Sequence, residues 1–74
     1  MSDSKYLELW RRMDRVVVRW TKAGHLEDAD YCMMEFFLYF HDMEELEGHV
    51  RIAEAAIVEG LGPEPEPEPE QGRT

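Results

Sequence analysis

Apolar residues recur at helical spacing along most of this 74-residue chain, and this spacing excludes folds built on β-sheets. Intervals of three and four residues place side chains on one face of an α-helix, whereas a half-buried strand alternates apolar with polar residues. Lys22 near the end of the first stripe and Gly24 just beyond it are a typical helix stop. We therefore predict a helix over about residues 4–23. Its stripe consists of Tyr6, Trp10, Met13, Val17 and Trp20.

A second stripe continues for nearly thirty residues and predicts one long helix over about residues 27–60, ended by Gly60, Gly62 and Pro63. The short connection between the two helices predicts that they lie antiparallel. Gly48 is the weak point, because a glycine inside a helix costs about 1 kcal/mol relative to alanine. The alternative is a break near Gly48 and a third short helix over 49–59 that folds back. The stripe contains Ala29, Met33, Phe36, Phe40, Met43, Leu46, Val50, Ala53 and Ile57.

A hairpin of these two helices cannot bury its own apolar surface. The second helix would extend beyond the first from residue 46 onward, and residues 31–40 are apolar on nearly every side. We therefore predict an all-α fold in which residues 1–60 form an antiparallel helical hairpin that dimerises into a four-helix bundle. A different protein could cover the same face instead. The predicted interface residues are Trp10, Trp20, Met33, Phe36, Phe37, Phe40, Met43, Leu46, Val50 and Ile57.

Residues 63–70 form a Pro-Glu repeat, and residues 61–74 are predicted to be a disordered tail. Proline lacks an N–H group and keeps the residue before it extended, so an extended and solvated arm is expected. The arm is interpreted either as a solubilising terminus without a specific partner or as a spacer or acidic docking arm.

The chain carries 17 acidic and 8 basic residues, which gives a net charge of −9. This balance argues against direct binding of nucleic acid, because phosphate contacts need clustered Lys and Arg. The charge is divided unevenly, since the first predicted helix is basic and the second is acidic. Complementary flanks that pair the two helices are the expected use of Arg11, Arg15, Arg19 and Lys22. Another hypothesis is an acidic decoy that imitates nucleic acid through Asp42, Glu44, Glu45 and Glu47.

His41, Glu45 and His49 follow one another at intervals of four residues and would share one face of the long helix. Imidazole and carboxylate together suit zinc or iron, so a metal-binding bundle is an alternative function. A solvated polar face is the competing interpretation, and no other cofactor is expected. The usual di-iron pattern needs Glu three residues before His, and Leu46 holds that position.

We expect a non-catalytic cytoplasmic protein. Cys32 lies in the most apolar stretch, so a buried structural thiol is expected rather than a nucleophile served by His25. A single cysteine excludes an internal disulfide and fits a reducing compartment. Neither a targeting segment nor a membrane span is apparent, because the longest apolar run is far shorter than about 20 residues. The expected function is a small protein-interaction module, such as a regulator, adaptor or assembly factor, that acts through the second helix.

Overall fold

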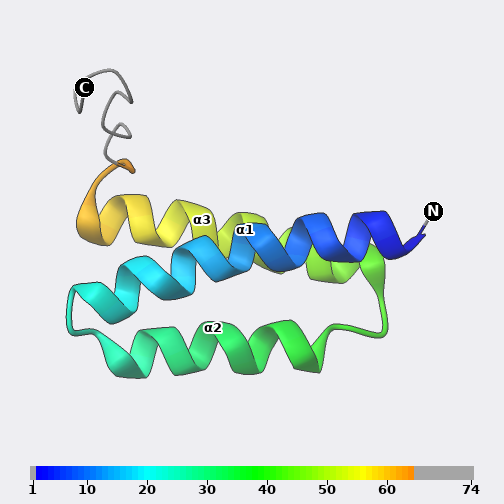
Figure 1. The fold of residues 1–74 in the computed structure, drawn as a ribbon, viewed down its shortest axis with the longest axis horizontal. Helices are drawn as coiled ribbons and strands as arrows, with labels where there is room; N and C mark the ends of the chain where they lie inside the picture. The colour runs from blue at the N-terminus through cyan, green and yellow to red at the C-terminus, as the bar shows by residue number, and fades with distance from the viewer. Residues whose placement is uncertain (1, 65–74) are drawn as a thin grey trace, which may run out of the picture.

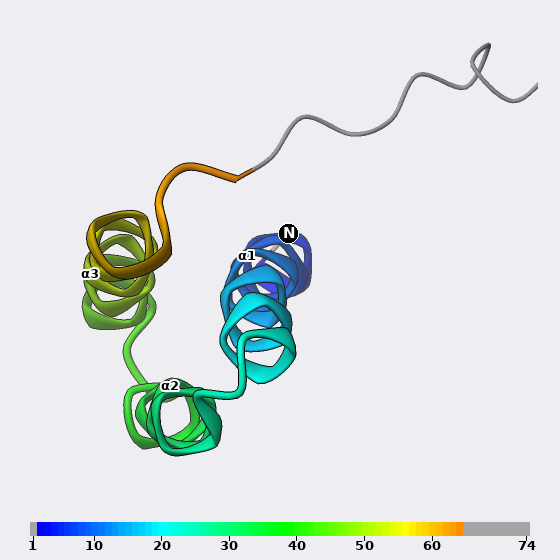
Figure 2. The same ribbon diagram turned by 90° about the vertical axis from the view of Figure 1, so that its left-hand side faces the viewer.

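Three α-helices pack together in the computed structural model, which describes residues 2–64 (Figure 1). They are α1 (Ser2–Lys22), α2 (Leu26–Leu38) and α3 (Met43–Leu61), and no strand occurs among the described residues. Viewed along the helices, α1, α2 and α3 lie at the corners of a triangle (Figure 2). The all-α prediction is confirmed, whereas the two-helix hairpin, and the four-helix bundle assembled from two such hairpins, are wrong.

Both ends of α1 lie within two residues of the predicted range of about 4–23. Gly24 adopts a φ of +86°, a left-handed conformation that favours glycine. The N–H of His25 donates to the Trp20 carbonyl at 2.9 Å, and the N–H of Gly24 donates to the Thr21 carbonyl at 3.0 Å. These two bonds form a Schellman motif, which satisfies carbonyls at the end of the helix and turns the chain toward α2.

The predicted long helix over 27–60 is interrupted at residues 39–42, which separate α2 from α3. Asp42 has an extended backbone, and its side chain accepts hydrogen bonds from the N–H groups of Glu44 at 3.1 Å and Glu45 at 3.2 Å. An aspartate in this position begins a new helix rather than continuing an old one. The break therefore lies before Met43 and not near Gly48, which is inside α3.

The core consists of one apolar stripe from each helix, and the fold-back of α3 completes it. The third stripe follows the predicted spacing, but α2 buries Cys32 where the sequence pattern favoured Met33. Half-buried side chains such as Trp10 and Met43 pack around this core. The buried residues are Leu9, Met13, Val16 and Trp20 from α1, Ala29, Cys32 and Phe36 from α2, and Leu46, Val50, Ala53 and Ile57 from α3.

Opposite charges join α1 to α3 at the edge of this core. The Arg12 guanidinium donates to both carboxylate oxygens of Glu54, at 3.0 and 2.8 Å. Lys5 lies 3.5 Å from Glu47, which also accepts a hydrogen bond from Arg51 at 3.2 Å. The basic first helix and the acidic third helix thus pair, but through Lys5 and Arg12 rather than through the predicted arginines.

The predicted tail over 61–74 is described only in part. Leu61 is the last residue of α3, and Gly62, Pro63 and Glu64 follow it. Residues 65–74 lie outside the described part of the chain, so the disorder predicted for them stays a prediction.

Two glycines of α3 should respond oppositely to alanine. A Cβ at Gly48 would meet no atom within 4 Å, whereas one at Gly60 would lie 2.9 Å from Cη2 of the Trp20 ring. We expect Gly48→Ala to raise the free energy of unfolding by about 1 kcal/mol through helix propensity. Gly60→Ala should lower the free energy of unfolding by about 1 kcal/mol, because the cost of displacing the packed Trp20 indole exceeds the gain in helix propensity. Urea unfolding of both variants checks this, and equal gains at both positions would contradict the close packing of Trp20.

Stability should fall in acid partly through Glu54. The hydrogen bonds from Arg12 hold the pKa of this carboxyl below its ordinary value. A depressed folded pKa stabilises the protein above the unfolded value, about 4.3, and this stabilisation is lost as the pH falls through the folded value. We expect Glu54→Gln to lower the free energy of unfolding at pH 7 by under about 1 kcal/mol and to flatten its acid decline. Urea unfolding across the acid range tests this, with exposed Glu59→Gln as the control. An unchanged acid slope in Glu54→Gln would contradict the assignment.

Candidate interaction surface

The side of α2 that points away from the core is apolar. Because Ala29, Cys32 and Phe36 turn inward, the remaining large apolar residues of this helix lie outside. Phe37 is 62% exposed, Leu38 60% and Met34 59%. We call the following five residues the outer α2 face: Leu26, Met33, Met34, Phe37 and Leu38. Met33, Met34, Phe37 and Leu38 are neighbours on the helix surface, because they are linked by separations of three and four residues. Leu26 lies about two turns nearer the N-terminal end of the helix, with the exposed Asp30 between.

Aromatic contacts with α1 hold one end of this face in place. The Trp10 ring packs edge-on against Phe36 with centroids 5.0 Å apart, and lies 6.0 Å from Phe37. Beyond them Tyr6 and Phe40 are 4.6 Å apart. Trp10 is half-buried in this arrangement. Ordered aromatic side chains lose little conformational freedom on binding, which suits them to anchor a partner.

The structure divides the ten predicted interface residues into three groups. Three of them, Met33, Phe37 and Phe40, are exposed, and two, Trp10 and Met43, are half-buried. The other half of the set lies in the core because α3 folds back onto α1 and takes up the apolar surface that a straight helix would expose. These buried residues are Trp20, Phe36, Leu46, Val50 and Ile57.

The predicted interface residues do not include Leu26, Met34 and Leu38, although residues 31–40 are recognisable from the sequence as apolar on nearly every side. The available signal was a second apolar stripe on α2, since Met34 and Leu38 are four residues apart beside the Met33 and Phe37 pair. A helix with apolar residues on two faces buries one against its own chain and leaves the other for a partner.

A hollow of about 310 Å³ lies between α2 and α3, and it is bordered by Trp20, Tyr31, Cys32 and Ile52. Cys32 is 6% exposed, and burial raises the pKa of its thiol. A raised pKa keeps the thiol protonated and weakens it as a nucleophile. The nitrogen Nδ1 of His25 lies 3.3 Å from the Asp28 carboxylate. Cys32 therefore has the properties of a core residue and not those of a thiol activated by an imidazole.

The three predicted metal ligands do not share one helix. His41 is exposed in the turn before α3, Glu45 is exposed on α3, and His49 is half-buried. Among residues 2–64, no three His, Cys, Asp or Glu side chains are grouped so that they could hold a metal ion. The turn at residues 39–42 separates His41 from the helix that carries Glu45 and His49, so the three residues do not share one helix face. Metal binding stays a prediction, without the support of a common helix face.

His49 instead faces α2. Its Nδ1 lies 3.4 Å from a Glu35 carboxylate oxygen, within ion-pair distance but without hydrogen-bond geometry. Its ring stacks on Tyr39 with centroids 3.8 Å apart. These contacts join α3 to the C-terminal end of α2 and help to fix the angle of the turn between them.

Two of the four acids in the decoy hypothesis have structural partners. Asp42 caps α3, and Glu47 is held by Lys5 and Arg51. The positive charge of Lys5 is the main reason that the pKa of Glu47 is lowered. Asp42, Glu44 and Glu45 are exposed, whereas Glu47 is half-buried.

Comparison with protein-family models, with curated proteins and with solved structures finds no match to this chain. None of the helices in residues 2–64 combines the length and apolar content needed to cross a membrane.

The burial of Cys32 predicts slow reaction with thiol reagents. We expect native protein at neutral pH to react with a disulfide reagent at least about tenfold more slowly than urea-unfolded protein, because reaction needs an exposed thiolate. Absorbance of the released thiolate measures both rates. Equal rates in the two states would contradict the placement of Cys32 in the core.

Proposed function

We propose that this protein is a small non-catalytic interaction module that binds through the outer α2 face. The observation that carries the proposal is the group of large apolar side chains exposed together on the C-terminal half of the 13-residue α2, namely Met33, Met34, Phe37 and Leu38. Single exposed apolar residues are ordinary, but a contiguous group on a small protein marks a binding surface. Met33 and Met34 add unbranched side chains that adapt to a partner.

The partner that we propose is the outer α2 face of a second copy, packed with the two α2 helices antiparallel. Glu27, Asp28 and Asp30 are in the N-terminal half of α2, whereas the exposed apolar residues from Met33 to Leu38 are in the C-terminal half. An antiparallel pair centred between Met34 and Phe37 places the two acidic ends far apart. This arrangement avoids the like-charge repulsion that a parallel pair would suffer.

Each copy keeps its three-helix core in this dimer. Trp10 borders the outer α2 face, so α1 extends the contact beside Phe37. Tryptophan and phenylalanine at the centre of a contact commonly supply most of its binding free energy. Such a module would serve as a regulator, adaptor or assembly factor, with no reaction of its own.

Substitution at the centre of the face tests the proposal. We expect a solution mass of twice 8.7 kDa for the unchanged protein and of 8.7 kDa for Met34→Lys, since a buried lysine without a partner breaks the contact. Ile52→Lys is the matched control, because Ile52 is 62% exposed on α3. Sedimentation equilibrium measures the masses, and circular dichroism checks that each variant is folded.

A mass of 8.7 kDa for the unchanged protein at all concentrations would overturn the second copy as partner. Equal dissociation by Met34→Lys and Ile52→Lys would overturn the outer α2 face as the contact. A dimer that survives Met34→Lys would do the same.

A further inference from the structure

A largely exposed flank of α1 concentrates positive charge. Arg11, Arg15 and Lys22 are exposed there, and Arg19 is half-buried; we call these four residues the basic strip. Within residues 2–64, none of the four forms an ion pair, whereas Lys5 and Arg12 pair with carboxylates of α3. The basic strip thus makes no close ion pair with the described residues of a chain whose net charge is −9, although Arg15 is near enough to Glu54 to help lower the pKa of that carboxyl.

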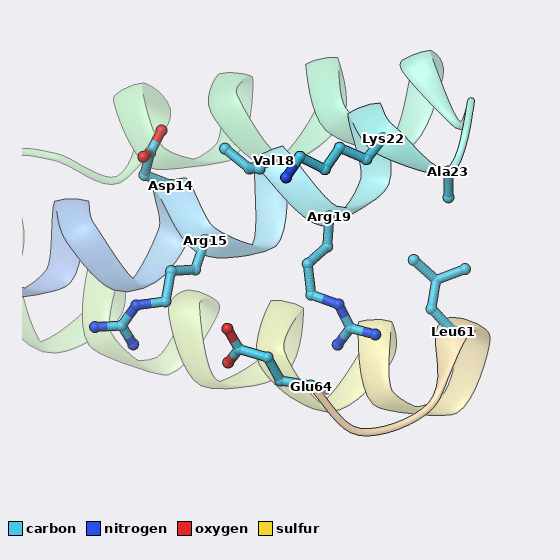
Figure 3. Close-up of a pocket in the computed structure, with 8 residues that line it drawn as sticks. All are labelled: Asp14, Arg15, Val18, Arg19, Lys22, Ala23, Leu61 and Glu64. Carbon is cyan, nitrogen blue, oxygen red and sulfur yellow. The ribbon is translucent and has the colours of Figure 1, made fainter. Parts of the chain in front are cut away.

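A hollow of about 570 Å³ adjoins the strip (Figure 3). Arg15, Arg19 and Lys22 border it together with the apolar side chains of Val18 and Leu61, and Asp14 adds one carboxylate to the three cations. Guanidinium groups bind carboxylates, and the apolar side chains suit the faces of saturated rings. The hollow is thus suited to an extended segment in which carboxylates alternate with apolar rings.

The end of α3 leads the chain into this hollow. The N–H of Gly62 donates to the Val58 carbonyl at 2.8 Å, and its φ of +87° turns the backbone away from the helix axis. Glu64, the first glutamate of the Pro-Glu repeat, borders the same hollow as Arg15 and Arg19 (Figure 3). The repeat therefore begins beside the strip.

The spacing of the repeat matches that of the strip. Arg11, Arg15 and Arg19 are four residues apart, which is about 6.0 Å along a helix. Glutamates recur at every second residue of 64–70, which is about 6.2 Å along an extended polyproline-like chain. A residue that precedes a proline favours extended backbone, and the repeat places a proline after each glutamate up to Glu68. Because the two spacings are nearly equal, successive carboxylates of the repeat can lie opposite successive guanidinium groups of the basic strip.

We infer that residues 64–70 dock along the basic strip of their own chain, antiparallel to α1, and shield it from other anions. Attachment at Glu64 gives the repeat an effective concentration of the order of millimolar at the strip. Exposed ion pairs are individually weak and are screened by salt, so the docked segment exchanges with solvent. An external acidic segment then binds the strip only by displacing the tail.

A spin label near the end of the repeat measures this docking in the full chain. Gln71→Cys adds a thiol just after the repeat, whereas Cys32 is buried with a raised pKa and is spared. Residue 71 of a docked tail would lie about 22 Å from Glu64, beside the N-terminal half of α1. We therefore expect the label to weaken the amide signals of residues 4–11 at least twofold at about 0.01 M salt, where the screening length is about 30 Å. The loss should disappear at about 1 M salt, where that length is about 3 Å.

Two variants with the same change in net charge separate docking from general attraction. Glu66→Gln, Glu68→Gln and Glu70→Gln together should abolish the signal loss. Glu44→Gln, Glu45→Gln and Glu59→Gln together, all exposed on α3, should leave it in place. Unchanged signals in the labelled protein at low salt would overturn the inference, as would equal losses in the two variants. Losses that appear only when labelled chains are mixed with unlabelled, isotope-enriched chains would place the tail on a second copy and would also overturn it.

Discussion

The Asp42 side chain accepts hydrogen bonds from the N–H groups of Glu44 and Glu45, and the course of the chain depends on this cap. A helix cap of this kind contributes about 1 kcal/mol, which is small beside the burial of a core. Its effect is nevertheless large, because it begins α3 after a turn instead of extending α2. Leu46, Val50, Ala53 and Ile57 then reach the core from the third side. The contacts of His49 with Glu35 and Tyr39 join α3 to α2 near the same turn.

The sequence predicts the extent of α1 and the core stripe of α3 correctly, because each combines regular apolar spacing with a clear helix stop. The buried stripe of α1 runs through Leu9 and Val16, whereas the predicted Trp10 and Val17 are half-buried. Prediction from the sequence fails at residues 39–42 for two physical reasons. Phe40 is apolar and continues the helical spacing through the turn, so the periodicity conceals the break. Asp42 is one of several acids in that region, and its role as a cap is hidden within what resembles an acidic face. The length mismatch of the predicted hairpin was the available clue, since folding the excess back buries it within the chain.

Moving the break also changes which apolar surface is left over. A straight second helix would have exposed the apolar residues from 46 onward, but Leu46, Val50 and Ile57 pack in the core, and only Ile52 and Val58 of that segment's large apolar residues stay exposed. The unpaired apolar surface is instead the outer face of the short α2, with Phe37 and Leu38 more than half exposed. Predicting Met34 and Leu38 as surface residues required knowing that Cys32, and not Met33, turns inward. Spacings of three and four residues are both helical, so sequence periodicity alone does not settle that choice.

The three helices also divide the molecular surface by charge. On one side of α1, Tyr6 and Trp10 approach the aromatic residues of α2, and on the other side Lys5 and Arg12 hold the acids of α3. The basic strip runs beyond that second side, where the hollow is bordered by Leu61 and Glu64 from the end of α3. An apolar partner on α2 and an acidic segment on α1 would therefore occupy different faces. Because neither would displace the other, salt should release the acidic segment while leaving an apolar contact at α2 largely intact.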